Sequence, residues 1–299
     1  MDMDMDMDMG VEALAADPAL AEATPAERLR FFHARKRDVA AASNMLSRYL
    51  EWRNRTLPLA DDQPRFGVGA MPEWMIFHGK ARDKSPIVHV QGAMYDQEVA
   101  TPDQYANASA QLMDENLDRN SLQKISLLVD VRGDASWPCP KGRQFVPVIR
   151  SLSKILGDCF PERLQRLIIY PMPWTGMALW SAVKPFVDQT TAAKIVMLPG
   201  PSRPGAPCPV ELGQYVEYEE IREDRRHRHT SLMQAADAVV GVDSSAPASA
   251  SASSGGGDGG GSSDVTIMPR QHEGKENRSW WRQLFAKDND AWKKQRKMG

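Results

Sequence analysis

Short, nearly continuous apolar runs constrain the fold of this chain more than any other feature. Runs such as ISLLV, LIIY and IVML are typical of strands that are buried on both faces, because a half-buried strand would alternate apolar and polar residues. The predicted strands are Pro86–Val90, Ile125–Asp130, Leu164–Tyr170 and Ile195–Leu198. Segments of helical length, 102–119 and 143–158, lie between them. This order predicts an α/β fold with a largely parallel sheet.

The N-terminal part has a different pattern. Residues 1–10 repeat Met-Asp, which gives neither a helical nor a strand period that could bury a face, so we expect them to be disordered. Residues 11–57 place apolar side chains at helical spacings, with Asp38 as an N-cap and Pro58 after the end. We therefore predict a helical subdomain over 11–57.

Composition limits the class of protein. The net charge is only −2, so a protein that binds nucleic acid over its whole surface is excluded. The three cysteines allow neither a disulfide framework nor a zinc pattern, and no apolar run is long enough to span a bilayer. The N-terminus lacks the features of a signal peptide. We expect a soluble, cytoplasmic protein.

The C-terminal part carries no core pattern. Residues 240–266, rich in Ser, Ala and Gly, predict a flexible linker. The tail, 267–299, has nine Lys and Arg against four acidic residues, all of them between 270 and 299. Its membrane-contact candidates are Trp280, Trp281, Phe285 and Trp292. Basic charge with Trp is typical of interfacial membrane segments, although a disordered tail or a protein-binding motif has the same composition.

Two long motifs carry a family resemblance. RLRFFHARKRDVAAASNMLSRYLEWR (28–53) resembles the N-terminal signature of CRAL-TRIO proteins, and FPERLQRLIIYPMPWTGMALWSAVKPFVDQTTAAKI (160–195) resembles their lipid-binding signature. VDVRG (129–133) lies between them and is similar to the family's VDLKG. Order and spacing both match.

The resemblance implies a helical N-terminal subdomain packed on an α/β/α lipid-binding domain with a mostly parallel sheet, here over 72–223. It also implies one lipid, phosphatidylinositol first or another phospholipid, held in an apolar cavity under a gate helix. Such a protein transfers or presents lipid between membranes, is peripheral to them, and needs no cofactor. Its partners are a phospholipid or other hydrophobic ligand and a transient membrane surface, without nucleic acid. The alternative is a regulatory or scaffold protein that keeps the fold without exchanging lipid.

The matching motif positions supply the candidate site. The headgroup candidates are Arg35, Lys36, Glu162, Asp188, Thr191 and Lys194. Their donors and acceptors suit a phosphodiester and inositol hydroxyls. Glu162 and Lys194 could equally form a structural ion pair, and Arg35 and Lys36 a solvated helix face.

The segment 174–187, WTGMALWSAVKPFV, is the candidate gate. Its gate and cavity candidates are Trp174, Met177, Leu179, Trp180, Val183, Phe186 and Val187. A helix that is apolar almost all round is either buried or faces lipid on one side, so an ordinary buried helix is the alternative.

No enzyme motif accompanies these features. The chain has no G-x-S-x-G elbow, H-E-x-x-H or Walker sequence, and Asp130 at a strand end is alone insufficient for catalysis. His227 and His229 lie in the charged run 222–229, which we interpret as solvated rather than metal-binding. We expect a protein without enzymatic activity and without a metal site.

Overall fold

A sheet of five strands organises the part of the chain that the computed structural model describes, which is residues 2–140, 144–174, 176–177, 180 and 192–232. All of these belong to the first of two units, residues 1–246 and 247–299. The strands are β1 (Met75–Lys80), β2 (Pro86–Gln91), β3 (Ile125–Asp130), β4 (Leu164–Met172) and β5 (Ile195–Pro199). They lie in sequence order, and only β1 is antiparallel to its neighbour.

This sheet confirms the α/β fold and the four strands that the apolar runs predicted. The sequence analysis missed β1. Its second half, His-Gly-Lys, interrupts the apolar run, and Gly79 has a positive φ of 72°. A Cβ at Gly79 would lie 2.3 Å from the carbonyl oxygen of Glu220, so a larger residue would push the C-terminal segment off this strand.

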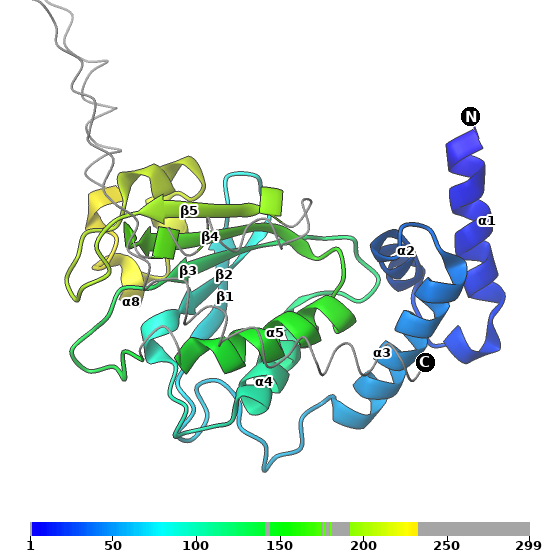
Figure 1. Cartoon of the computed structure of the whole chain (residues 1–299), viewed down its shortest axis with the longest axis horizontal. Helices are drawn as coiled ribbons and strands as arrows, with labels where there is room; N and C mark the ends of the chain where they lie inside the picture. Colours follow the sequence, from blue (N-terminus) through cyan, green and yellow to red (C-terminus); the bar gives the residue numbers. More distant parts are fainter. Residues whose placement is uncertain (1, 141–143, 175, 178–179, 181–191, 233–299) are drawn as a thin grey trace, which may run out of the picture. The chain divides into compact units, whose positions relative to one another are not determined.

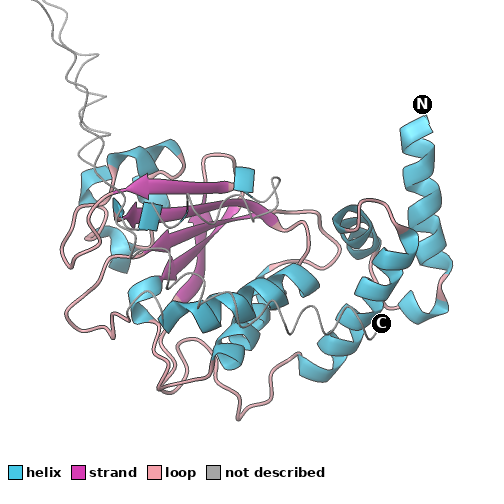
Figure 2. Ribbon diagram, viewed as in Figure 1, coloured by secondary structure: helices cyan, strands magenta, loops and turns pink. Residues whose placement is uncertain are grey.

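Different elements cover the two faces of the sheet (Figure 1). The helices α4 (Pro102–Asn116) and α5 (Phe145–Cys159) lie over the face that we call the front face, where Val88, Val90 and Tyr105 belong to one apolar cluster. The opposite, back face is covered by the C-terminal segment 199–232, in which Leu212, Val216 and Ile221 are buried. Figure 2 shows this segment as short helical turns joined by loops, namely η5 (Val210–Gln214), η6 (Tyr218–Glu220) and α8 (Glu223–Arg226).

The N-terminal helices form a separate apolar cluster. They are α1 (Asp2–Ala16), η1 (Pro18–Leu20), α2 (Pro25–Ala34) and α3 (Val39–Thr56). Thr24 and Glu27 form a capping box at the start of α2, and Asp38 caps α3 as predicted. Leu14, Phe31, Phe32 and Leu46 are buried together. This arrangement agrees with the helical subdomain expected over 11–57.

The expectation that residues 1–10 are disordered is corrected by α1, which begins at Asp2. Methionine favours helices, and aspartates near a helix N-terminus interact favourably with its dipole, so a segment without an apolar face can extend a helix whose later turns are packed. Gly10 lies directly against the ring of Phe32, where a Cβ would be 2.2 Å from Cζ.

Buried charges join this helical cluster to the loop before β3. The Glu27 carboxylate, fully buried, accepts hydrogen bonds from Tyr49 at 2.8 Å and from Arg119 at 2.8 and 3.0 Å. Arg30 donates to the carbonyl oxygens of Arg119 and Ser121. These hydrogen bonds join the helical cluster to the domain, although the buried Nε of Arg30 has no hydrogen-bond partner among the described residues.

Candidate functional site

Two complete rows of apolar side chains run across the front face of the sheet. The strand register gives the first row as Phe77, Val88, Leu127, Leu167 and Ile195. It gives the second row as Met75, Val90, Val129, Ile169 and Met197. We call these the front rows. No polar side chain interrupts either one.

The front rows are buried unequally. At β2, Val88 and Val90 are almost inaccessible, because α4 and the aromatic cluster around Trp74 and Tyr105 pack on them. From β3 to β5 every member of the two rows is only half-buried. The apolar side chains over these three strands are therefore less completely covered than those of β2.

Helix α5 borders this half-buried surface with a matching apolar face. Phe145, Leu152 and Leu156 pack partly against the same cluster as Leu127 and Val129, and all five remain half-buried. Ile149 is 55 % exposed. A well-packed helix would bury such side chains completely, so α5 and β3–β5 together present the apolar walls of a binding site.

A charged pair lies at the amino ends of the strands next to these walls. The Nζ atom of Lys194 is 4.0 Å from Oε2 of Glu162, and both side chains are partly exposed. Glu162 comes two residues before β4 with a φ of 58°, and Lys194 comes directly before β5. Parallel pairing of β4 with β5 thus brings together two candidates that are 32 positions apart.

The other headgroup candidates do not join this pair in the described residues. Arg35 and Lys36 lie in the turn between α2 and α3, where Lys36 is exposed with a φ of 54°. Within the part of the chain that the structure describes, no ion pair or hydrogen bond links them to Glu162 or Lys194. Asp188 and Thr191 lie outside the described residues.

The gate candidates are only partly described. Trp174, Met177 and Trp180 are helical, whereas Leu179, Val183, Phe186 and Val187 fall outside the described residues. Trp174 was predicted to line the gate or the cavity. In the structure it is 80 % exposed and faces solvent. Trp174 is helical and lies two residues after Met172, the last residue of β4. Gly176 lies so close to the Met172 side chain that a Cβ would be 2.2 Å from Sδ.

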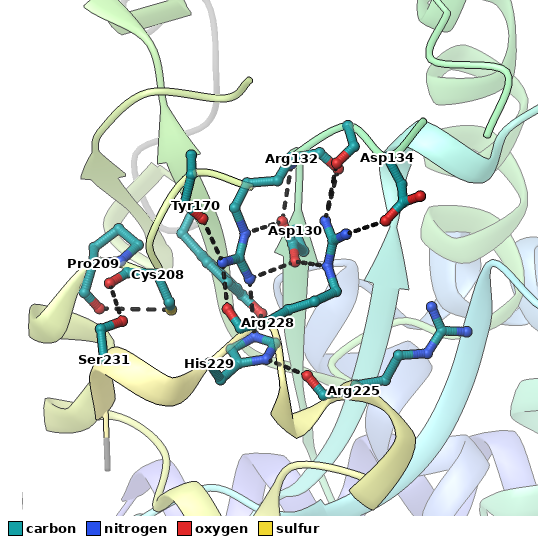
Figure 3. A network of polar contacts seen from close by, with 12 residues as sticks. Asp130, Arg132, Asp134, Tyr170, Cys208, Pro209, Arg225, Arg228, His229 and Ser231 are labelled. Atoms are coloured by element: carbon teal, nitrogen blue, oxygen red, sulfur yellow. Dashed lines mark hydrogen bonds and ion pairs between the residues drawn. The ribbon is translucent and has the colours of Figure 1, made fainter. Parts of the chain in front are cut away.

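The sequence analysis missed a buried polar network at the carboxyl ends of β3 and β4 on the back face (Figure 3). Asp130 is fully buried and accepts hydrogen bonds from the side chain of Arg132 at 3.0 and 2.8 Å and from Arg228 at 3.4 Å. Arg132 also donates to the carbonyl oxygens of Ala206 and Arg228. The network therefore ties the C-terminal segment to the sheet.

His229 occupies the centre of this network. Its Nδ1 lies 2.9 Å from the carbonyl oxygen of Arg225, and its Nε2 lies 3.0 Å from the hydroxyl of Tyr170 and 3.4 Å from Arg132. This arrangement assigns the neutral tautomer with the proton on Nδ1, because Nε2 must accept from both donors. The pKa of His229 is lowered to about 4, chiefly by burial and also by the charges of Arg132 and Arg228, against the charge of Asp130, which raises it.

The acid in the network stays ionised. Burial alone would raise the pKa of Asp130, but hydrogen bonds from Arg132 and the charges of Arg132 and Arg228 hold that pKa below its usual value. The interpretation of 222–229 as a solvated run is wrong at its C-terminal end, since His229 is completely buried and the Arg228 side chain is 8 % exposed. Asp130, the partner of Arg228, lies 98 positions earlier in the chain. Its place at the end of a strand was the one sign of this network in the sequence.

The network fits a structural role. Every group named above has a partner, and neither of the hollows found in the described residues is lined by Asp130, Arg132 or His229. We take the apolar front face, rather than this network, as the candidate lipid site. None of the helices in the described ranges has the length and hydropathy needed to cross a bilayer.

Comparison with known proteins places the domain. The family model described as CRAL/TRIO domain matches residues 71–224. The phosphatidylinositol/phosphatidylcholine transfer protein SFH12 of Arabidopsis thaliana is 25 % identical over 57 % of this chain and 34 % of its own length. The phosphatidylinositol transfer protein PDR17 of Saccharomyces cerevisiae is 23 % identical over 56 % of this chain and 50 % of its own.

A third relative and a solved structure agree. The phosphatidylinositol transfer protein CSR1 of Eremothecium gossypii is 26 % identical over 64 % of this chain and 47 % of its own length. The matches thus span between a third and a half of these relatives. The crystal structure of Sfh5 superposes with a TM-score of 0.50 at 19 % identity, covering 71 % of this chain and 80 % of that one.

Proposed function

This chain belongs to the CRAL/TRIO domain family, and on that basis we propose that it binds one lipid on its front face and transfers it between membranes. The relatives named as phosphatidylinositol transfer proteins support lipid transfer as the activity. Phosphatidylinositol is the first candidate for the ligand.

The observation that carries the proposal is the half-buried apolar surface over β3–β5, opposite the half-buried face of α5. A diacyl lipid has about 30 methylenes, and at about 0.8 kcal/mol each their exposure to water costs roughly 25 kcal/mol. A protein that removes such a lipid from a bilayer must offer apolar surface of similar extent. The two uninterrupted front rows are the kind of surface required.

The charged pair gives this surface a polar end. Lys194 directly precedes Ile195 of the first front row, so a phosphate near its Nζ would leave acyl chains free to lie along the rows. Glu162 could accept hydrogen bonds from inositol hydroxyls, and Lys36 and Arg35 would approach from the turn after α2. Segment 174–187 remains the proposed gate, with the exposed Trp174 at its entrance suited to the membrane interface.

Mass spectrometry of an organic extract of the purified protein tests lipid binding directly. We expect one phospholipid per chain, with phosphatidylinositol enriched over its share in the host membranes. An extract without stoichiometric lipid, from protein that also fails to take up lipid from vesicles, would favour a scaffold that keeps the fold only.

The headgroup assignment predicts a selective loss of transfer. Lys36→Ala combined with Lys194→Ala should slow phosphatidylinositol transfer between vesicles about tenfold or more, since hydrogen bonds to charged groups contribute about 1.5–3 kcal/mol each. The thermal midpoint should change little, because the Glu162–Lys194 pair is partly exposed. A matched control is Lys124→Ala with Lys154→Ala, which removes the same charge from two exposed positions. Unchanged transfer in the first double variant would reject the assignment.

The tail is proposed as an accessory membrane contact. Its candidates, Trp280, Trp281, Phe285 and Trp292, lie outside the described residues, and so does the linker expected over 240–266. Deleting residues 270–299 should weaken sedimentation with anionic liposomes, because each basic residue near such a surface contributes about 1 kcal/mol. Sedimentation with neutral liposomes is the control. Equal sedimentation of the full and shortened chains with anionic liposomes would exclude this role.

A further inference from the structure

The back face of the sheet contains a polar hollow that is separate from the lipid surface proposed above. It has a volume of about 280 Å³ and lies between the β1–β2 turn, the start of β4 and the C-terminal segment. Ser126 and Arg166 pair across β3 and β4 and form its floor, and Gln214 and Tyr215 form its wall. Strand side chains alternate between faces, so Arg166 points away from the front rows that contain Leu167.

The guanidinium of Arg166 makes no direct ion pair or hydrogen bond among the described residues. Its central carbon lies 5.1 Å from the centroid of the Tyr215 ring. The carboxylate of Asp83 in the same hollow is near enough for the charge of Arg166 to help lower its pKa, but no carboxylate of the described residues lies within 4.0 Å of the Arg166 nitrogens. Stacking on an aromatic ring occupies one face of a guanidinium and leaves its N–H edge free, which is the edge that binds an oxyanion.

The other charged groups of the hollow are already engaged. Arg82 donates to the carbonyl oxygen of Gly213 at 2.6 Å and pairs with Glu217 at 2.5 Å. Asp83 accepts from the backbone N–H and the hydroxyl of Ser85, at 3.1 and 2.5 Å. Its carboxylate still has lone pairs that could accept from a ligand hydroxyl. The hollow therefore offers the free N–H donors of Arg166 for a ligand and, beside them, the carboxylate of Asp83 as an acceptor.

We infer that this hollow binds the phosphate monoester of a small polyol, with the phosphate on the N–H edge of Arg166 and a hydroxyl toward Asp83. The volume is below the range of drug-sized pockets, which agrees with a small polar ligand. The same chemistry could be a free metabolite or a phosphorylated lipid headgroup, and the experiment separates the two sources.

The test is titration of the full chain with sn-glycerol 3-phosphate by calorimetry, with glycerol as the uncharged probe. We expect saturable binding of the ester and none of glycerol. Arg166→Gln should weaken binding about tenfold or more, as expected when a charged hydrogen-bond donor is lost. Arg166→Lys should give an intermediate affinity, because it keeps the charge but loses the planar fork. Arg203→Gln, at an exposed position outside the hollow, is the charge-matched control and should bind normally.

Two further arms identify the source and separate this site from the lipid site. Vesicles with phosphatidylinositol 4-phosphate replace the soluble ester in a sedimentation assay. Arg166-dependent binding of vesicles alone would assign the phosphate to a membrane lipid, and Arg166-dependent binding of the ester would assign it to a free solute. Lys194→Ala should leave binding of the soluble ester unchanged. If neither probe responds to Arg166→Gln while the variant remains folded by circular dichroism, the inference is wrong.

Discussion

Ile168 and Ile169 are neighbours in β4, yet Ile168 on the back face is completely buried and Ile169 on the front face is half-buried. The same contrast holds for Leu128 and Leu127 in β3. On the back face the chain covers its own sheet with residues 199–232 and ties them down with a buried ionic network. On the front face the described helices cover β2 completely but β3–β5 only in part. One face is thus part of the stable core, and the other has half-buried apolar side chains, on which the proposed lipid site is based.

Among the variants that test this difference between the faces, Asp130→Ala should lower the free energy of unfolding most. Asp130→Ala leaves the guanidinium of Arg132, which is 2 % exposed, without its carboxylate, and the loss of one partner of a buried ion pair costs about 3–5 kcal/mol. The free energy of unfolding from urea titration should fall by this amount. Asp134→Ala is the control, because Asp134 pairs with the same Arg228 but is 38 % exposed, and its loss should destabilise the protein far less. Equal losses in the two variants would contradict a structural role for the network.

A pair of alanine variants in β4 compares the two faces directly. Ile168→Ala should lower the free energy of unfolding by about 3 kcal/mol, because it leaves a cavity in the closed back face. Ile169→Ala should cost about 1 kcal/mol, since less of its surface is buried. Lipid recovered with the purified protein should decrease for Ile169→Ala and stay constant for Ile168→Ala. The opposite order of stabilities, or lipid loss in the back-face variant, would show that the faces are assigned wrongly.

A smaller effect than that of Ile168→Ala is a pH dependence that only the back face should produce. The pKa of His229 is lowered from 6.5 to about 4 by burial among Asp130, Arg132, Tyr170 and Arg228. The unfolded chain therefore binds more protons between pH 4 and 6.5, and the stability contributed by neutral His229 is complete above pH 6.5 and lost as the pH falls toward 4. Between pH 7 and pH 5 the loss should be about 2 kcal/mol.

Urea titrations of the wild type and His229→Gln at both pH values measure this contribution. The glutamine variant should lose less stability on acidification than the wild type does. His89, whose pKa is lowered to about 3 chiefly by burial and next by the charge of His229, remains in both proteins, so the comparison measures His229 together with its effect on His89. Identical losses would mean that His229 is protonated in the folded protein.

Much of the architecture could be predicted before any coordinates. The strands β2 to β5 were predicted within two residues at each end, because sheets buried on both faces require uninterrupted apolar runs. The helix α3 was predicted from its cap and its spacing. The strand β1 and the first turns of α1 were not, since neither carries the apolar period on which such predictions depend.

The site divides in the same way. Glu162 and Lys194 were selected from two matching motif positions, and parallel pairing of β4 and β5 does bring them together. The exposure of Trp174 could not be predicted, because an apolar residue in an apolar segment has the same sequence signal whether it is buried or faces solvent. The charged run ending at Arg228 and His229 was misread because charges in sequence are by default solvated, and burial depends on partners far away in the chain.

By itself the sequence determined the order of elements, the sheet and the family, because hydrophobic periods and long motifs are local properties. The tertiary structure alone decided which side chains of each strand face a closed core and which face open apolar surface. It also decided that Asp130 would meet Arg228 and that Arg166 would stack on Tyr215 without a direct ion pair among the described residues. These outcomes depend on which distant segment packs on which face, and burial and charge compensation are properties of that packing rather than of any single stretch of sequence.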